Sequence, residues 1–166
     1  YVLPPADKDM RSARFFPAAL LNYGQNILAG GDREGANEEA IVFRREDGER
    51  RVLTWQQLRD DSIALATFLK GAGVGSQDRV AAWMPNVPET IVAMIATSIL
   101  GATFTSTSPD FGVAGVLDRF GQVKPTVLIA ADGYVYANRR HTRLDRLSEV
   151  VAGLPSLEAV IVHGEL

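Results

Sequence analysis

Residues 79–106 read RVAAWMPNVPETIVAMIATSILGATFTS and change their hydrophobic pattern twice. A short apolar run over 79–84 predicts a buried strand, and another over 102–106 predicts a second one. Between them, residues 88–100 are apolar at helical spacing, with Pro88 in the first turn, where its missing N–H is not needed. A strand, a helix and a second strand in this order predict parallel strands joined by a helical crossover.

The same alternation continues downstream. The patterns predict a helix near 113–122, a strand over 126–130, a helix near 144–151 and a strand over 157–162. Apolar strands that alternate with helices indicate an α/β fold, in which a mostly parallel sheet carries helices on both faces.

Upstream, residues 40–54 predict a hairpin, because Asp47-Gly48 favours a tight turn with positive φ. Thr54 is expected to begin a helix, and Gln57 three residues later completes a capping box. A second capping signal, Asn86 to Glu89, precedes the apolar helix of the central unit.

The chain is expected to divide into two parts. Residues 1–36 predict an N-terminal segment that packs its aromatic side chains on the main domain, which comprises residues 37–166. The helix over 88–100 is apolar nearly all round, a pattern typical of a helix covered on every side. We therefore expect that cover to come from sequence outside these residues, and the chain alone to expose apolar surface around 91–100.

Composition excludes several classes of function. The 166 residues have a net charge of −3, so no basic surface exists for nucleic acid or an anionic membrane. Without cysteine there are no disulfides or thiolate sites, and the only two histidines, His141 and His163, argue against a histidine metal cluster. Residues 90–109 are uncharged but too rich in Ser and Thr for a membrane helix. With no secretory signal visible, we expect a cytoplasmic location.

The glycine-rich stretch is not placed to bind phosphate. Gly71, Gly73 and Gly75 follow a helix and precede a strand, whereas a dinucleotide loop follows a strand and opens a helix. These glycines are therefore predicted to end the helix that begins at Thr54. The sequence also has no G-x-x-x-x-G-K-[ST], no G-x-S-x-G and no H-E-x-x-H.

One candidate ligand site is the segment TFTSTSPDFG at residues 103–112. It leaves a strand at the carboxyl edge of the predicted sheet, where open α/β folds bind ligands. The alternative is structural: Asp110 caps the next helix and Phe111 packs into the core.

A second candidate is the cluster of Arg139, Arg140 and Arg143 around His141. Guanidinium groups bind phosphate through paired donors, so this cluster could clamp a phosphate. The alternative is a solvated basic face.

Four segments resemble a known family. They read FFPAALLNYGQNIL (15–28), LTWQQL (53–58), DRVAAWMPNVPETIVAMIATSILGATFTSTSPDFG (78–112) and GVLDRFGQVKPTVLIAADGY (115–134). They are similar to the acyl-CoA synthetases, a group of adenylate-forming enzymes. Within that group, TSPDFG followed by GVLDRFGQ-x-x-P points to the acetoacetate–CoA ligases.

The resemblance implies part of the large N-terminal domain of such an enzyme. It also implies a two-step ligation that uses ATP, Mg²⁺, coenzyme A and acetoacetate. The family's ATP loop and its C-terminal lid with the catalytic lysine are not in this sequence, so residues 1–166 are expected to be inactive without the remainder of the chain. Left alone, they would self-associate through an unpaired sheet edge. The alternatives are a synthetase for acetate or another short acid, and a non-catalytic α/β binding module.

The resemblance also implies coenzyme A-binding residues. In related acetyl-CoA synthetases the turn that matches Pro109-Asp110-Phe111 lies along the coenzyme A site; they have Gly-Gly-Phe there, so only Phe111 is shared. The stretch that matches 139–142 approaches the phosphates of the coenzyme A nucleotide, with Arg139 the best match and Arg140 beside it. No residue is implied as a catalyst or a metal ligand.

Overall fold

A four-stranded parallel sheet forms the centre of the protein, in a computed structural model that describes residues 2–3 and 9–166. In spatial order its strands are β10 (Ala159–His163), β7 (Val127–Ala131), β5 (Arg79–Trp83) and β6 (Thr103–Thr107). All three neighbouring pairs run parallel. The predicted α/β class is therefore confirmed.

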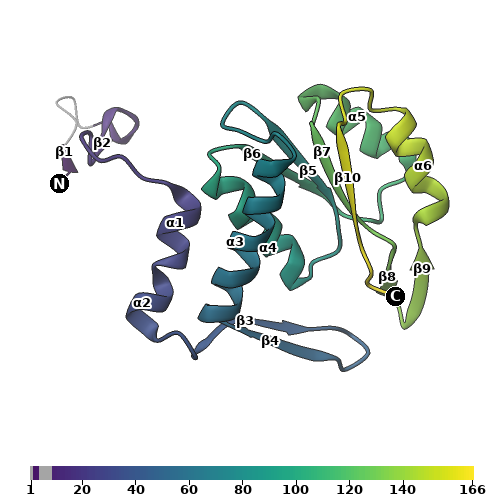
Figure 1. Ribbon diagram of the computed structural model, residues 1–166, viewed down its shortest axis with the longest axis horizontal. Coiled ribbons are helices and arrows are strands. Elements are labelled where there is room, and N and C mark those ends of the chain that lie inside the picture. Colours follow the sequence, from purple (N-terminus) through teal and green to yellow (C-terminus); the bar gives the residue numbers. More distant parts are fainter. Residues whose placement is uncertain (1, 4–8) are drawn as a thin grey trace.

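Helices cover both faces of this sheet (Figure 1). On one face α3 (Trp55–Gly71) and α4 (Pro88–Ile99) pack on the side of Val80 and Ala82. On the other, α5 (Val113–Val123) and α6 (Leu144–Ala152) pack on the side of Ala81 and Trp83. Successive strand residues point to opposite faces, which is why a continuous apolar run can serve two layers of helices.

The predicted hairpin consists of β3 (Glu39–Arg44) and β4 (Arg50–Thr54), with Gly48 at φ 94° in the turn. The capping box at the start of α3 is also confirmed: the Thr54 side chain accepts from the Gln57 N–H, and the Gln57 side chain accepts from the Thr54 N–H. The second capping signal is wrong. The N-cap of α4 is Val87, whose side chain has no polar atom, so Asn86 lies one residue too early to cap the helix.

The apolar helix α4 obtains its cover from within the chain, contrary to the expectation of a layer from outside. Two short helices, α1 (Tyr23–Leu28) and α2 (Gly30–Glu34), lie beside α3 and α4 (Figure 1). Leu28 of α1 is buried in one cluster with Val92 and Ile95 of α4. No residue of α4 is exposed, so the expected apolar surface around 91–100 is absent. Among the described residues no helix is both long and apolar enough to cross a membrane.

The aromatic side chains before α1 do not pack on the main domain. A short 3₁₀ turn (Met10–Ser12) separates β1 (Val2–Leu3) from β2 (Arg14–Phe15), and the two strands pair only with each other, away from the central sheet (Figure 1). Phe15 is 62% exposed and Phe16 56%. Because α1 begins only at Tyr23, Phe15 and Phe16 do not share its buried face.

A hairpin that the sequence patterns did not predict follows β7. It consists of β8 (Gly133–Tyr136) and β9 (Arg139–Thr142), joined by Ala137 and Asn138 at φ 51° and 55°. Two consecutive residues with positive φ are typical of the tight turns that match the twist of a hairpin.

Candidate functional site

The carboxyl ends of β5 and β6 open onto a cavity of about 300 Å³. Its lining comprises the residues that follow β5, the end of β6 and one residue of α4: Met84, Pro85, Asn86, Thr90, Ser106, Thr107 and Ser108. This is the edge at which open α/β sheets bind ligands. The hydroxyl and amide groups give the cavity a polar, uncharged rim.

The loop 108–112 continues from this rim to α5. Neither structural alternative for it holds: α5 is capped by Gly112 rather than Asp110, and Phe111 is 38% exposed rather than packed in the core. The Phe111 ring lies 4.5 Å from the guanidinium carbon of Arg119, a cation–π contact on the surface of α5. The Phe111 ring is thus held against α5, in the loop that begins at the cavity residue Ser108, while part of the ring stays accessible.

The β8–β9 register divides the arginine cluster. Tyr134 pairs with His141, and Tyr136 pairs with Arg139, so these four side chains share one face of the hairpin. Arg140 pairs with Val135 on the opposite face. Both Arg139 and Arg140 are exposed, and within the described part of the chain neither guanidinium has a hydrogen bond or an ion pair. Their donors are available to an anion.

Arg143 differs from the other two arginines because each of its three guanidinium nitrogens already donates a hydrogen bond within the protein. Its Nε donates to the carbonyl oxygen of Pro109 at 2.9 Å, and one terminal nitrogen donates to the Tyr134 hydroxyl at 2.7 Å. The other terminal nitrogen donates to the Thr142 carbonyl at 3.0 Å. Arg143 therefore joins the loop to the hairpin and is not free to clamp a phosphate.

Tyr134 is the residue of this region that sequence reasoning missed. It is 8% exposed and its ring stacks on His141, with ring centroids 5.0 Å apart. Burial raises the pKa of Tyr134, a hydrogen bond to the Asp110 carboxylate raises it further, and the charge of Arg143 opposes the shift. The phenol stays neutral at physiological pH and can donate to Asp110 while it accepts from Arg143.

A network of ion pairs lies where β10 ends. Arg45 pairs with Glu165 at 2.8 Å, Arg51 pairs with Glu89 at 2.7 Å, and His163 lies 3.3 Å from Glu165. These pairs join the β3–β4 hairpin to the central sheet and to α4. Among the described residues no group of histidines and carboxylates could hold a metal ion.

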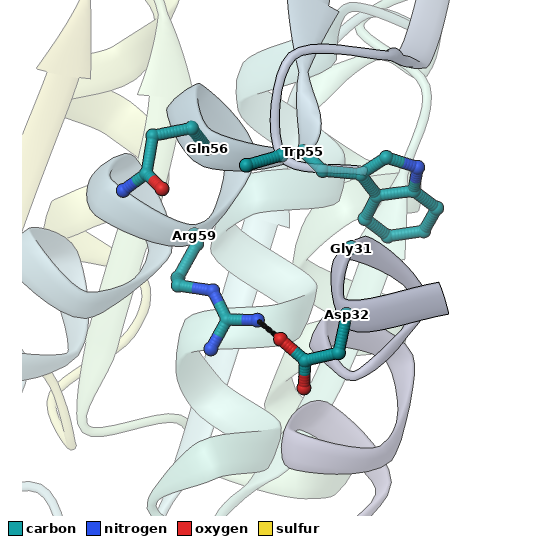
Figure 2. Close-up of a pocket in the computed structure, with 6 residues that line it drawn as sticks. Gly31, Asp32, Trp55, Gln56 and Arg59 are labelled. Carbon is teal, nitrogen blue, oxygen red and sulfur yellow. Dashed lines mark hydrogen bonds and ion pairs between the residues drawn. The ribbon is translucent and has the colours of Figure 1, made fainter. Parts of the chain in front are cut away.

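A separate cavity of about 280 Å³ lies between α2 and the start of α3 (Figure 2). Its charged groups are paired with each other, because Arg59 donates to Asp32 and to the Leu28 carbonyl, both at 3.0 Å. The Trp55 ring lies so close to Gly30 that a Cβ there would be 2.5 Å from it. The residues around this cavity therefore make the contact between α2 and α3.

Comparison with known proteins agrees with the resemblance seen in the sequence. The chain is 47% identical over 154 residues to acetoacetyl-coenzyme A synthetase of Rhizobium meliloti (strain 1021), covering 93% of this chain and 23% of that protein. It is 37% identical over 150 residues to malonamoyl-CoA synthetase vrtB of Penicillium aethiopicum, covering 89% and 21%.

The fold agrees with a solved structure, acetoacetyl-CoA synthetase from Streptomyces lividans. The TM-score is 0.85 at 40% identity, and the match covers 92% of this chain and 24% of that one. The chain thus spans about a quarter of the length of the relatives it matches. A sequence model of AMP-binding enzymes matches residues 31–165, most of the chain, and the chain belongs to that family.

Proposed function

We propose that the chain is the N-terminal part of an ATP-dependent acetoacetate–CoA ligase. The observation that supports this most is the likeness to acetoacetyl-CoA synthetase from Streptomyces lividans, at a TM-score of 0.85 and 40% identity over 92% of the chain. The use of ATP and coenzyme A favours a cytoplasmic location.

The proposed reaction has two steps. A carboxylate oxygen of acetoacetate bonds to the α-phosphorus of ATP, the bond to pyrophosphate breaks, and acetoacetyl-adenylate forms. The thiol of coenzyme A then gives up its proton and its sulfur bonds to the acyl carbon, while AMP leaves with the carbon–oxygen electron pair. Mg²⁺ supplies charge compensation at the phosphates. The described residues contain no group of histidines and carboxylates that could hold this ion.

This chain would contribute to the coenzyme A side of the active site. Phe111 offers a partly exposed ring, and Arg139 and Arg140 offer guanidinium groups with free donors. Arg139 shares its hairpin face with Tyr134, which is joined to the Phe111 loop, whereas Arg140 lies on the opposite face. Phosphate oxygens of the coenzyme A nucleotide are the natural acceptors for such donors.

The overall activity is tested by ATP–pyrophosphate exchange in the full-length protein, with acetoacetate, acetate and butyrate compared. Exchange that is fastest with acetoacetate supports the proposal. Exchange that is faster with another acid would leave a ligase of the same family with a different substrate. The similarity to malonamoyl-CoA synthetase makes that the second candidate. No exchange with any acid would refute the enzyme and favour a binding module.

The coenzyme A contacts need a separate test. Replacing Arg139 by Ala is expected to raise the KM for coenzyme A about tenfold, the effect of losing one hydrogen bond to a charged group. The exchange rate should not change, because adenylation needs no coenzyme A. An unchanged KM for coenzyme A in the Arg139→Ala variant would remove the phosphate contact from the proposal.

A further inference from the structure

The loop 108–112 and the hairpin β8–β9 each contact other parts of the fold: the Phe111 ring lies 4.5 Å from the Arg119 guanidinium carbon, and the Asn138 N–H donates to the Glu46 carboxylate at 2.8 Å. The loop's own bonds are a turn from the Phe111 N–H to the Ser108 carbonyl at 3.2 Å and a long contact from the Asp110 N–H to Ser108 Oγ at 3.4 Å. The hairpin forms a two-stranded sheet of its own and does not join the central one. Neither the Arg119 contact nor the bond to Glu46 joins the loop to the hairpin, and that connection is made by other side chains.

Two side chains make that connection. The half-buried Arg143 donates to the Pro109 carbonyl on the loop and to the Tyr134 hydroxyl on the hairpin. The Asp110 carboxylate of the loop is near enough to raise the pKa of the Tyr134 phenol. The backbone of Arg143 is itself fixed, because its N–H donates to the Asp132 carbonyl at 2.7 Å, directly after β7. The connection is thus anchored to the end of a core strand.

From this geometry we propose that Arg143 is a positioning residue that sets the spacing between the Phe111 loop and the Arg139 face of the hairpin, so that both meet one nucleotide ligand. The inference rests on the proposed function, which assigns the two segments to the coenzyme A site. A guanidinium group is planar and its donors point in fixed directions, so two of its bonds determine a distance as well as an attachment. A lysine at this position has a single flexible ammonium group and would not fix that distance.

The proposal makes a selective prediction for the full-length protein. Replacing Arg143 by Met keeps an unbranched side chain, shorter than that of arginine, and removes the bonds to Pro109, Tyr134 and Thr142. The KM for coenzyme A is expected to rise about tenfold, while the rate of ATP–pyrophosphate exchange and the KM for ATP stay unchanged. Arg143→Lys should not restore the KM. The matched control is Arg146→Met, an exposed arginine less than one helical turn away in α6, which should leave all these quantities unchanged.

A second variant keeps the test independent of damage to the fold. Tyr134→Phe retains the ring against His141 and removes only the hydroxyl, so it should raise the KM for coenzyme A in the same direction. If Arg143→Met and Tyr134→Phe both lower pyrophosphate exchange, the connection serves the fold as a whole and the positioning role is overturned. If neither changes the KM for coenzyme A while Arg139→Ala raises it, the positioning role is overturned and the proposed coenzyme A site stands. If Arg139→Ala also has no effect, the proposed site itself fails.

Discussion

Replacing Gly24 by Ala tests whether α1 is the cover of α4. Gly24 lies directly on the backbone of α4: a Cβ added to it would be 2.8 Å from the Ile95 carbonyl oxygen and 2.9 Å from the Ile99 nitrogen. Both atoms belong to the helix backbone and cannot rotate aside. The alanine side chain therefore has to push α1 away from α4.

The expected loss follows from what α1 buries. When α1 moves, Leu28, now 5% exposed, loosens from Val92 and Ile95, and the two bonds from the Asn22 amide to the Ser98 and Ile99 carbonyls lengthen. Overpacking of this kind costs about 1–3 kcal/mol. Part of this cost is offset, because alanine in a helix stabilises the folded state by about 0.5–1 kcal/mol relative to glycine. The difference between the two terms is a net decrease of about 0–2.5 kcal/mol in the free energy of unfolding, and their central values give about 1.3 kcal/mol.

Urea unfolding followed by tryptophan fluorescence measures this change, since the Trp55 ring packs against Gly30 and Gly31 of α2. The matched control is Gly121→Ala in α5, where an added Cβ meets nothing within 4 Å, so this variant should gain about 0.5–1 kcal/mol. A lower free energy of unfolding in Gly24→Ala and a higher one in Gly121→Ala would support the close contact between α1 and α4. A Gly24→Ala variant as stable as the original chain would refute the argument that α1 packs on α4 at this distance.

Three further predictions concern a helix cap, an ion pair and a titrating phenol. Thr54→Ala removes the side-chain acceptor of the capping box and should lower the free energy of unfolding by about 1 kcal/mol in urea, whereas Thr54→Ser should retain it. Arg45→Met removes the partner that lies 2.8 Å from the Glu165 carboxylate, whose side chain is 5% exposed, and should lower the free energy of unfolding by about 2 kcal/mol. The double variant Arg45→Met, Glu165→Gln should recover most of this loss, whereas additive effects of the two substitutions would contradict the pairing. Folding raises the pKa of Tyr134 above its ordinary value of 10.0, so the stability that this phenol contributes is complete below pH 10.0 and is lost as the pH rises through the raised pKa. Urea midpoints measured over a pH series should show this loss in the original chain and not in Tyr134→Phe.

The central sheet and its helices were predictable because each carries its own local signal. Short apolar runs marked all four strands, and the structure places each within about two residues of the expected bounds. The start of α3 was predictable to the residue, since Thr54 and Gln57 satisfy each other's backbone without help from the rest of the fold. Apolar runs and capping boxes depend only on residues close together in the sequence, so they can be recognised without knowledge of the tertiary structure.

The errors arise where the outcome depends on distant contacts. The composition of α4 correctly indicated a helix buried on all sides, but it could not say that the cover comes from residues 23–34. The β8–β9 hairpin was missed because its turn is Ala137-Asn138 rather than Asn-Gly. The run Tyr134-Val135-Tyr136 before it has high β-propensity and was the available signal.

The arginine cluster shows why composition alone could not define the candidate site. Three arginines around one histidine look equivalent in the sequence, yet in the fold they differ in the face on which they lie and in their hydrogen bonds. Strand alternation sends Arg139 and Arg140 to opposite faces of the hairpin, and Arg143 uses its guanidinium nitrogens on protein oxygens. What qualifies an arginine for phosphate binding is therefore the number of its donors left free and the face on which they lie. On these grounds we propose Arg139 as the residue that binds a nucleotide phosphate, and Arg143 as the residue that sets the distance between Arg139 and Phe111.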